Sequence, residues 1–370
     1  MNENDETVSG SMENIDLGKL DPRKTPCVPD RITSATNSFS SPRLSFRQDG
    51  QVDVPLGTSP SDKTVFARDN SSWERAISHK SSAESLQISV ESFSVGKNAD
   101  TPEINEDIFA RFGKTFVIAD GMTAKGSYEP NSSKERSGKS AGKIAADLVA
   151  DTVSKTDLNG KPLVDYITEK MKSFYIVNYP EALEDPTLRF AATMVTARVL
   201  REEIIITQVG DSAFRINGNE VYSEHRQIDI LDARARSAAI IKALEEGKVE
   251  AEAVRIGREQ IEPSLKCQYT YRNNPDHELG FAYIDGSEVP DKFVKEYHFP
   301  LAGLSTLEFF TDGYVIPPSE ITIEAWEQTH AQVCVEDPYR YKKYLATKPS
   351  DDRTVAIIRF SALSSLTKSP

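Results

Sequence analysis

The hydrophobic and polar positions of this chain repeat with two different periods. Residues 86–95 (LQISVESFSV) alternate apolar and polar side chains, which is typical of a half-buried strand. Residues 115–119 (TFVIA) form a mostly apolar, β-branched run, as expected of a strand that is buried on both faces. At 141–153 and 163–176 the apolar residues instead recur at helical spacing. The pattern therefore predicts strands first and two amphipathic helices after them.

The second half of the chain returns to short strands. The pattern predicts a hairpin of strands at 190–200 and 203–209, a charged helical segment at 229–258 and a late helix capped by Ser319. Further strands are predicted at 106–112, 213–216, 267–271, 279–284, 293–299, 306–312 and 354–360. This order indicates an α+β layered domain, and the scattered helices exclude a regular doubly wound sheet.

Composition divides the chain into an ordered domain and two tails. Residues 1–80 are rich in Ser, Thr, Asn, Asp and Pro, and their few apolar residues follow no period, so we expect a disordered N-terminal tail. The ordered domain is expected over 81–362. Residues 363–370 are expected to form a frayed C-terminal tail.

The chain carries an excess of negative charge, with 57 acidic against 44 basic residues and a formal net charge of -13. This charge argues against nucleic acid or an anionic membrane as a partner. No apolar run is long enough to span a membrane, and the first residues lack the basic and apolar regions of a signal peptide. The three cysteines share no zinc or redox spacing. We therefore expect a soluble, cytoplasmic, monomeric protein.

Acidic residues stand at the ends of several predicted strands. The buried strand at 115–119 runs directly into Asp120, and a carboxylate in that position stays charged at low cost only when it is solvated or chelated. The acids in comparable positions are Glu106, Asp107, Asp120, Asp312 and Asp351. Each motif alone is typical of an ordinary turn or a solvated surface pair. Their shared position at strand ends is what indicates a carboxylate-lined metal site.

A carboxylate cluster without histidine or cysteine favours Mg²⁺ or Mn²⁺ over zinc. The five histidines of the chain lie in none of the acidic motifs. Two such ions about 3.5–4 Å apart can bridge a water, lower its pKa and hold it in line with a phosphoryl group. Asp120, mounted on a buried strand, is the expected bridge between the ions. Gly121 lets the backbone come close enough for its own carbonyl to be a ligand.

Taken together, six segments resemble the metal-dependent protein phosphatases of type 2C, in the bacterial-like branch of that family. In chain order they are NEDIF, FVIADGM, ATMVTARV, QVGDSAFRI, LEFFTDGY and SDDRTVAIIRF, and they extend over residues 86–361. The resemblance implies two antiparallel sheets packed face to face and flanked by helices. It also implies a phosphorylated protein as substrate, and hydrolysis of its phosphoserine or phosphothreonine by a hydroxide that bridges two Mn²⁺ or Mg²⁺ ions.

The resemblance implies a role for each matching residue. Asp120 and Asp107 would be the catalytic residues, the first bridging both ions and the second orienting a metal-bound water. Asp351 is preferred to Asp352 because the family's ligand lies three residues before the threonine of the last strand, here Thr354. The other implied ligands are Glu106 and the Gly121 carbonyl for the second ion, Asp312 and Asp351 for the first, and Asp211 for a weaker third ion.

Three positions depart from the family's pattern. Pro102 stands where many members have the arginine that docks the substrate phosphate, Met122 where some have a proposed general-acid histidine, and Ile316 where an acid is common. The docking cation would then come from elsewhere, and the sequence offers Lys97, Lys125, Arg136 and Lys139. These departures leave open a catalytically weak or inactive module with a regulatory or binding role. A domain stabilised by calcium is a further alternative.

Residues 225–300 lie where this family carries a variable flap beside the active site. The charged helical part of this flap, at 229–258, fits a substrate-selecting lid and a solvated surface equally well. Both alternatives stay open at the level of the sequence.

Overall fold

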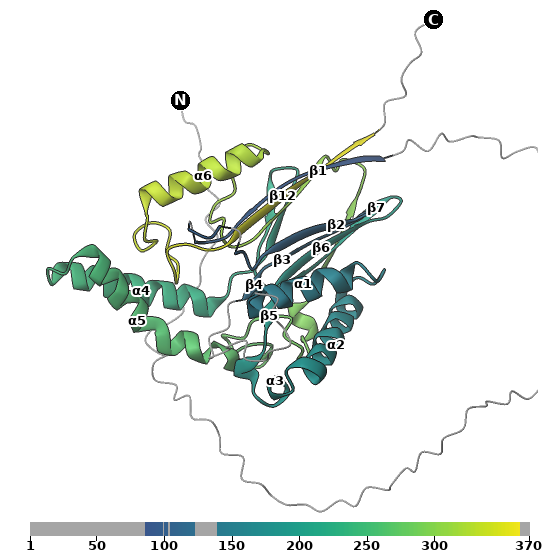
Figure 1. Cartoon of the computed structure of the whole chain (residues 1–370). Helices are drawn as coiled ribbons and strands as arrows, with labels where there is room; N and C mark the ends of the chain where they lie inside the picture. The colour runs from purple at the N-terminus through teal and green to yellow at the C-terminus, as the bar shows by residue number, and fades with distance from the viewer. Residues whose placement is uncertain (1–85, 99, 103, 123–138, 363–370) are drawn as a thin grey trace, which may run out of the picture. The chain divides into compact units, whose positions relative to one another are not determined.

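The structure is a computed structural model, and it describes residues 86–98, 100–102, 104–122 and 139–362 (Figure 1). The tails predicted at 1–80 and 363–370 lie outside the described residues, so these two predictions stay untested. Within the described part, no helix is both long and apolar enough to cross a membrane.

Two five-stranded antiparallel sheets form the centre of the domain, as the sequence predicts (Figure 1). The first has the strand order β1-β12-β11-β8-β9 and the second the order β10-β7-β6-β3-β2, and a short pair, β4-β5, stands apart. The bounds are β1 Leu86–Val95, β2 Ile108–Phe112, β3 Thr115–Ala119, β4 Gly121–Met122, β5 Ala191–Ala192, β6 Met194–Val199, β7 Glu203–Val209, β8 Ala213–Ile216, β9 Glu220–Tyr222, β10 Lys295–Pro300, β11 Thr306–Phe310 and β12 Arg353–Ala362.

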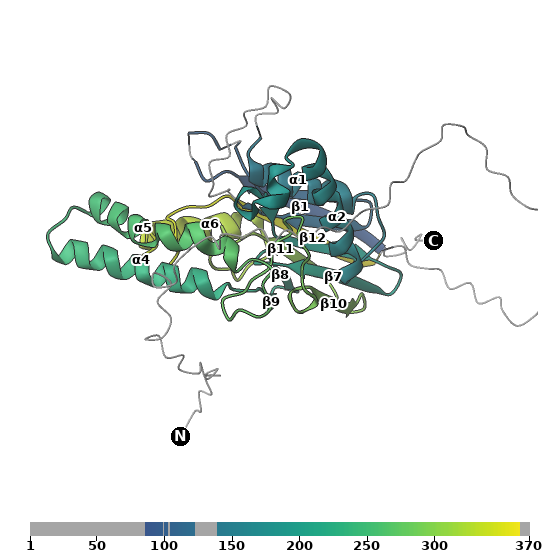
Figure 2. The ribbon, with the colours of Figure 1, turned by 90° about the horizontal axis from the view of Figure 1, so that it is seen from below.

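Helices cover the outer faces of both sheets (Figure 2). Helices α1 and α2 pack on the sheet that contains β3 and β6, and α6 packs on the sheet that contains β11 and β12. A hairpin of α4 and α5 extends beyond the sheets (Figure 1). The bounds are α1 Ala141–Val153, α2 Gly160–Asn178, α3 Glu181–Glu184, α4 Gln227–Glu245, α5 Glu250–Cys267 and α6 Ile323–Glu336.

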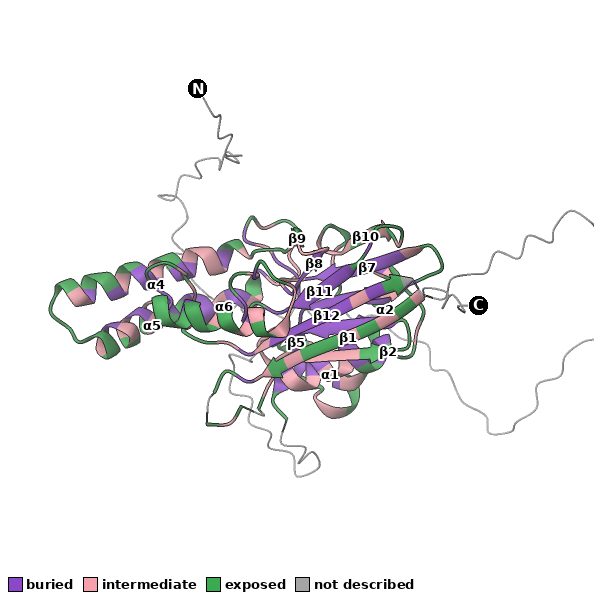
Figure 3. Ribbon diagram, turned by 90° about the horizontal axis from the view of Figure 1, so that it is seen from above, coloured by how far each residue is buried: buried purple, intermediate pink, exposed green. Residues whose placement is uncertain are grey.

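Strand β3 is buried along its whole length because both of its faces are covered. Phe116 and Ile118 belong to the core between the two sheets, whereas Val117 and Ala119 pack against the cluster beneath α1 and α2. Figure 3 shows the same contrast elsewhere: β11 and β12 are largely buried, and the edge strand β1 alternates. The α+β class with two packed antiparallel sheets is therefore confirmed.

Two of the predicted strands are wrong. Over 267–271, α5 ends at Cys267 and the next three residues form a 3₁₀ turn in place of a strand. Over 279–284 it forms only isolated bridges, of Phe281 with Arg272 and of Ile284 with Ala192. The apolar side chains of both segments are buried in a small cluster with Ile228 of α4, which includes Tyr271, Leu279, Phe281 and Tyr283. Burial against a helix produced the apolar pattern that a strand would also give.

The late helix begins four residues after its predicted cap. Thr322 caps α6, and its side chain accepts a hydrogen bond from the backbone of Ala325 at 3.1 Å, so the prediction of Ser319 as the cap is wrong. Arg359 donates a hydrogen bond to the carbonyl of Ile321 at 2.6 Å. This bond ties the residue before the cap to β12.

His330 on α6 makes the stability of the domain sensitive to acid. Burial, together with the nearby charges of Arg353 and Arg340, lowers its pKa to about 4. In the unfolded chain a histidine has a pKa of about 6.5, so the unfolded state takes up the proton first as the pH falls. This stabilising contribution is complete above pH 6.5 and is lost as the pH falls towards 4.

We expect a change from pH 7 to pH 5 to reduce the free energy of unfolding by about 1 kcal/mol through His330, with allowance for its partial exposure. The measurement is urea unfolding of the wild type and of His330→Gln at both pH values. The variant should lose about 1 kcal/mol less than the wild type. An equal loss in the two proteins would contradict the assignment.

Candidate metal centre and active site

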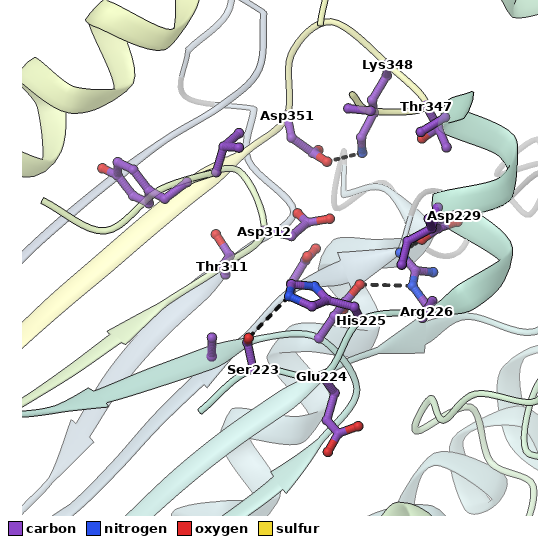
Figure 4. Close-up of a pocket in the computed structure, with 18 of the residues that line it drawn as sticks. Ser223, Glu224, His225, Arg226, Asp229, Thr311, Asp312, Thr347, Lys348 and Asp351 are labelled. Atoms are coloured by element: carbon purple, nitrogen blue, oxygen red, sulfur yellow. Dashed lines mark hydrogen bonds and ion pairs between the residues drawn. The ribbon is translucent and has the colours of Figure 1, made fainter. Parts of the chain in front are cut away.

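A cleft of about 600 Å³ lies at the ends of β3 and β11, between the sheets and the α4–α5 hairpin (Figure 4). The acids predicted from distant parts of the sequence meet on its walls. They are Glu106, Asp120, Asp211, Asp312 and Asp351. Gly121 lines the cleft as well. The structure thus brings together residues from the ends of separate strands, as the motif series requires.

Gly121 permits a close contact between the end of β3 and the start of α1. A Cβ atom at position 121 would lie 2.2 Å from the carbonyl oxygen of Gly142, and one at position 142 would lie 2.8 Å from the carboxylate of Glu106. The carbonyl of Asp120 accepts a hydrogen bond from the backbone of Thr193 at 2.9 Å. The backbone around Asp120 is therefore fixed from two sides, which makes it a rigid mount for a ligand.

Glu106 and the acidic pair before β12 are linked by Lys97. Glu106 accepts a hydrogen bond from Ser140, the cap of α1, at 2.6 Å, and its other carboxylate oxygen lies 3.0 Å from the ammonium of Lys97. Asp352 accepts hydrogen bonds from the backbone N–H groups of Lys97 at 2.7 Å and of Glu106 at 3.1 Å. Asp352 therefore fixes the backbone, while its neighbour Asp351 lines the cleft.

Asp107 is buried behind the cleft with one carboxylate oxygen unpaired. Thr311 donates a hydrogen bond to Oδ2 at 2.8 Å, and Oδ1 is buried without a hydrogen-bond partner in the described part of the chain. Burial and the charges of Asp351 and Asp352 raise the pKa of Asp107 to about 7, against the effect of hydrogen bonds from Thr311 and Thr354. An orphaned oxygen of this kind calls for a donor, such as an ordered water.

The acids repel one another strongly. Burial raises the pKa of Asp120 well above its ordinary value, and the charges of Asp107, Asp312, Asp351 and Asp211 raise it further. The pKa of Asp312 is also raised, mainly by burial, although this side chain is open to the solvent of the cleft and its charge is partly screened. A cluster of this kind is stabilised by any cation that binds between its members.

Four cationic residues on the cleft wall escaped the sequence analysis, namely Arg226, Arg258, Arg340 and Lys348, and two of them pair with its acids. Arg226 lies 2.9 Å from Asp211 and 2.7 Å from Asp229, and Lys348 forms an ion pair with Asp351 (Figure 4). Arg226 precedes a charged helical segment and looks like an ordinary surface residue in the sequence. The one local signal for Lys348 is its position three residues before Asp351.

The predicted docking cations lie in different places. Lys97 contacts Glu106, at the edge of the cleft, whereas Lys139 pairs with Asp147 of α1 at 2.6 Å and does not line the cleft. Lys125 and Arg136 lie outside the described residues. These assignments therefore stay predictions.

No group of three or more His, Cys, Asp or Glu side chains forms a ready metal site within the described residues. Two of the acids instead form ion pairs with cationic side chains of the protein, Asp351 with Lys348 and Asp211 with Arg226. The donor set nevertheless fits a hard divalent cation by type, since it combines carboxylates, the Gly121 backbone and the unpaired Oδ1 of Asp107. Lys348 would compete with a metal ion for Oδ2 of Asp351.

The α4–α5 hairpin forms one wall of the cleft. Asp229 and Ala233 of α4 and Arg258 of α5 line it. Arg236, fully buried on α4, donates hydrogen bonds at 3.0–3.1 Å to three backbone carbonyls of the loop that leads to Lys348, those of residues 339, 340 and 346. A merely solvated surface is therefore the wrong interpretation for the inner side of this segment.

No family model matches the chain. No curated protein matches it at a significant level either.

Solved structures with a similar fold include two serine/threonine phosphatases and PppA, a regulatory component of T6SS. The catalytic domain of the serine/threonine phosphatase PstP, in complex with two manganese ions, is 14% identical with a TM-score of 0.40, over 75% of this chain and 99% of that one. Stp1 from Staphylococcus aureus is 15% identical with a TM-score of 0.40, over 74% and 96%. PppA from Pseudomonas aeruginosa is 14% identical with a TM-score of 0.40, over 74% and 98%. Two of these three proteins are serine/threonine phosphatases, and all three have low sequence identity to this chain.

Proposed function

We propose that the protein is a metal-dependent protein phosphatase that hydrolyses phosphoserine and phosphothreonine in other proteins. The observation that carries the proposal is the meeting of five strand-end acids in one cleft. Oxygen ligands of this kind suit Mn²⁺ or Mg²⁺. No cysteine lines the cleft among the described residues, so a thiolate nucleophile is not on hand there.

When bound, two Mn²⁺ or Mg²⁺ ions would supply a hydroxide for attack on phosphorus and would neutralise charge on the phosphoryl group. Asp120 would be one of the residues that hold the ions, on a backbone that is fixed by the contacts of Gly121 with Gly142 and of Asp120 with Thr193. Asp312, Asp351, Glu106 and the Gly121 carbonyl would complete the set of ligands. Asp107 would orient the attacking water through its unpaired Oδ1.

The test is release of phosphate from phosphoserine and phosphothreonine peptides by the full-length protein. We expect turnover with Mn²⁺ or Mg²⁺, none after removal of divalent ions with EDTA, and little with Ca²⁺, which prefers more ligands at longer distances. Folding is monitored by circular dichroism in each buffer. A folded protein without turnover in any metal would contradict the proposal.

A second candidate is a regulatory or binding module without turnover. The observation in its favour is that two of the expected metal ligands already form ion pairs with lysines, Asp351 with Lys348 and Glu106 with Lys97. Pro102, in place of a docking arginine, points the same way. The two candidates give opposite results in the same assay, since the module would bind phosphopeptides without hydrolysing them.

A further inference from the structure

We propose that Lys348 is the phosphate-docking cation of the cleft, and that Asp351 holds it until a divalent cation takes that carboxylate. The inference deepens the proposed function and rests on it. Lys348 would supply the positive charge that Pro102 cannot provide.

Lys348 reaches from the cleft wall into the acidic cluster. Its ammonium is paired with Asp351, and Figure 4 shows it directed towards the interior of the cleft, where Asp312 lies close by. The side chain is 40% exposed, so substrate can reach it. Lys348 thus borders the acids that would hold the metal, next to the place where a phosphoryl group would bind.

The loop that carries Lys348 is anchored on both sides. Arg258 of α5 donates a hydrogen bond at 3.0 Å to the carbonyl of Thr347, the residue before Lys348. Earlier in the loop, the carboxylate of Asp337 accepts hydrogen bonds at 2.8–3.1 Å from four consecutive backbone N–H groups, those of residues 341–344. A lysine presented by such a fixed backbone can change partner by moving its side chain alone.

Two of the other cations near the cleft are each held by two carboxylates, and Arg258 and Arg340, which also line it, donate hydrogen bonds to the backbone carbonyls of Thr347 and Gly313. Arg226 is held by two carboxylates, Asp211 and Asp229, and by the hydroxyl of Tyr283. Lys97 is held between Glu106 and Asp352. Among the described residues Lys348 forms an ion pair with one carboxylate, that of Asp351, which is itself a candidate metal ligand.

Charge balance favours the exchange of partners. A divalent cation on Asp351 would repel the ammonium and withdraw its carboxylate, while a phosphate ester would bring new anionic oxygens to the same place. An ammonium on a flexible four-carbon stem suits such a movement. Its loss should therefore weaken phosphate binding and should leave the metal ligands in place.

The experiment compares full-length wild type with Lys348→Ala, Lys348→Arg and the matched control Lys342→Ala. Lys342 lies on the same loop, is 59% exposed and pairs with Glu250 outside the cleft. The readouts are kcat and KM for a phosphoserine peptide, the inhibition constant of inorganic phosphate, and Mn²⁺ affinity by calorimetry.

We expect Lys348→Ala to raise KM and the inhibition constant of phosphate by about tenfold or more, as the loss of one charge-assisted contact predicts. Mn²⁺ affinity should be unchanged or tighter, because an internal competitor for Asp351 is gone. Lys348→Arg should keep part of the phosphate affinity, and Lys342→Ala should behave as wild type.

An unchanged phosphate inhibition constant in an active Lys348→Ala variant would overturn the inference and leave the proposed function intact. Weaker Mn²⁺ binding without an effect on phosphate would also overturn it, since Lys348 would then only support the fold. If the wild type shows no turnover, the proposed function fails. Calorimetric titration of inorganic phosphate with Mn²⁺ present then decides: loss of binding in Lys348→Ala supports the inference, and any other result overturns it.

Discussion

Asp120→Asn is expected to abolish metal-dependent phosphatase activity while the fold stays at least as stable as the wild type. The charges of Asp107, Asp312, Asp351 and Asp211 all repel the carboxylate of Asp120. A neutral amide removes that repulsion from the metal-free protein but cannot bridge two cations. Because bound metal supplies several kcal/mol of transition-state stabilisation, we expect a rate loss of at least about a thousandfold.

The measurement combines steady-state kinetics in saturating Mn²⁺, calorimetric titration of Mn²⁺ and thermal unfolding in EDTA. The matched control is Asp276→Asn, the same chemical change at an exposed residue away from the cleft. It should retain the wild-type rate and metal affinity. A full rate in Asp120→Asn would show that the site has been wrongly assigned.

Glu308→Ala is expected to give the largest loss of stability, about 3–5 kcal/mol in the free energy of unfolding. Glu308 on β11 and Arg215 on β8 form a two-point ion pair with both N···O distances at 2.6 Å, and their side chains are 0% and 3% exposed. The indole N–H of Trp326 donates to the same carboxylate at 2.9 Å, which ties α6 to the sheet. Without Glu308, the buried guanidinium of Arg215 loses its counter-charge.

Urea unfolding measures the effect, with two comparisons. Lys155→Ala breaks an exposed ion pair with Asp151 of α1, in which the two side chains are 63% and 58% exposed. This change should lower the free energy of unfolding by less than about 0.5 kcal/mol. The double variant Arg215→Met with Glu308→Leu should recover much of the loss, because no charge is left buried without a partner. A loss below about 1 kcal/mol in Glu308→Ala would mean that the pair contributes little.

Local patterns predicted most of the strands and placed most of the acids near their ends. The apolar run of β3 ends at Asp120 because burial of a charged side chain is costly without a partner. On β11 the charge of Glu308 is buried, but it is paired with Arg215. The pattern failed at 279–284, where α4 buries aromatic side chains that are not paired in a sheet. Periodicity reports burial, and it does not report which element covers the residue.

The cations of the cleft could not be predicted for a different reason. Lys348 reaches Asp351 because hydrogen bonds from Arg236 and Arg258 hold its loop against the α4–α5 hairpin. The acceptors of these bonds are backbone carbonyls, which every residue has, so the sequence of the loop does not indicate them. The contacts of Asp352 with the backbone at Lys97 are hidden in the same way.

The bonds of Arg236 to the carbonyls of residues 339, 340 and 346 also bear on protein engineering. A chimera that receives the α4–α5 hairpin of another protein without the accompanying loop would lose these hydrogen bonds unless the new helix also carries an arginine at this position. Transferring the hairpin and the loop together as one segment would keep the attachment, and with it the support of the loop that leads to β12.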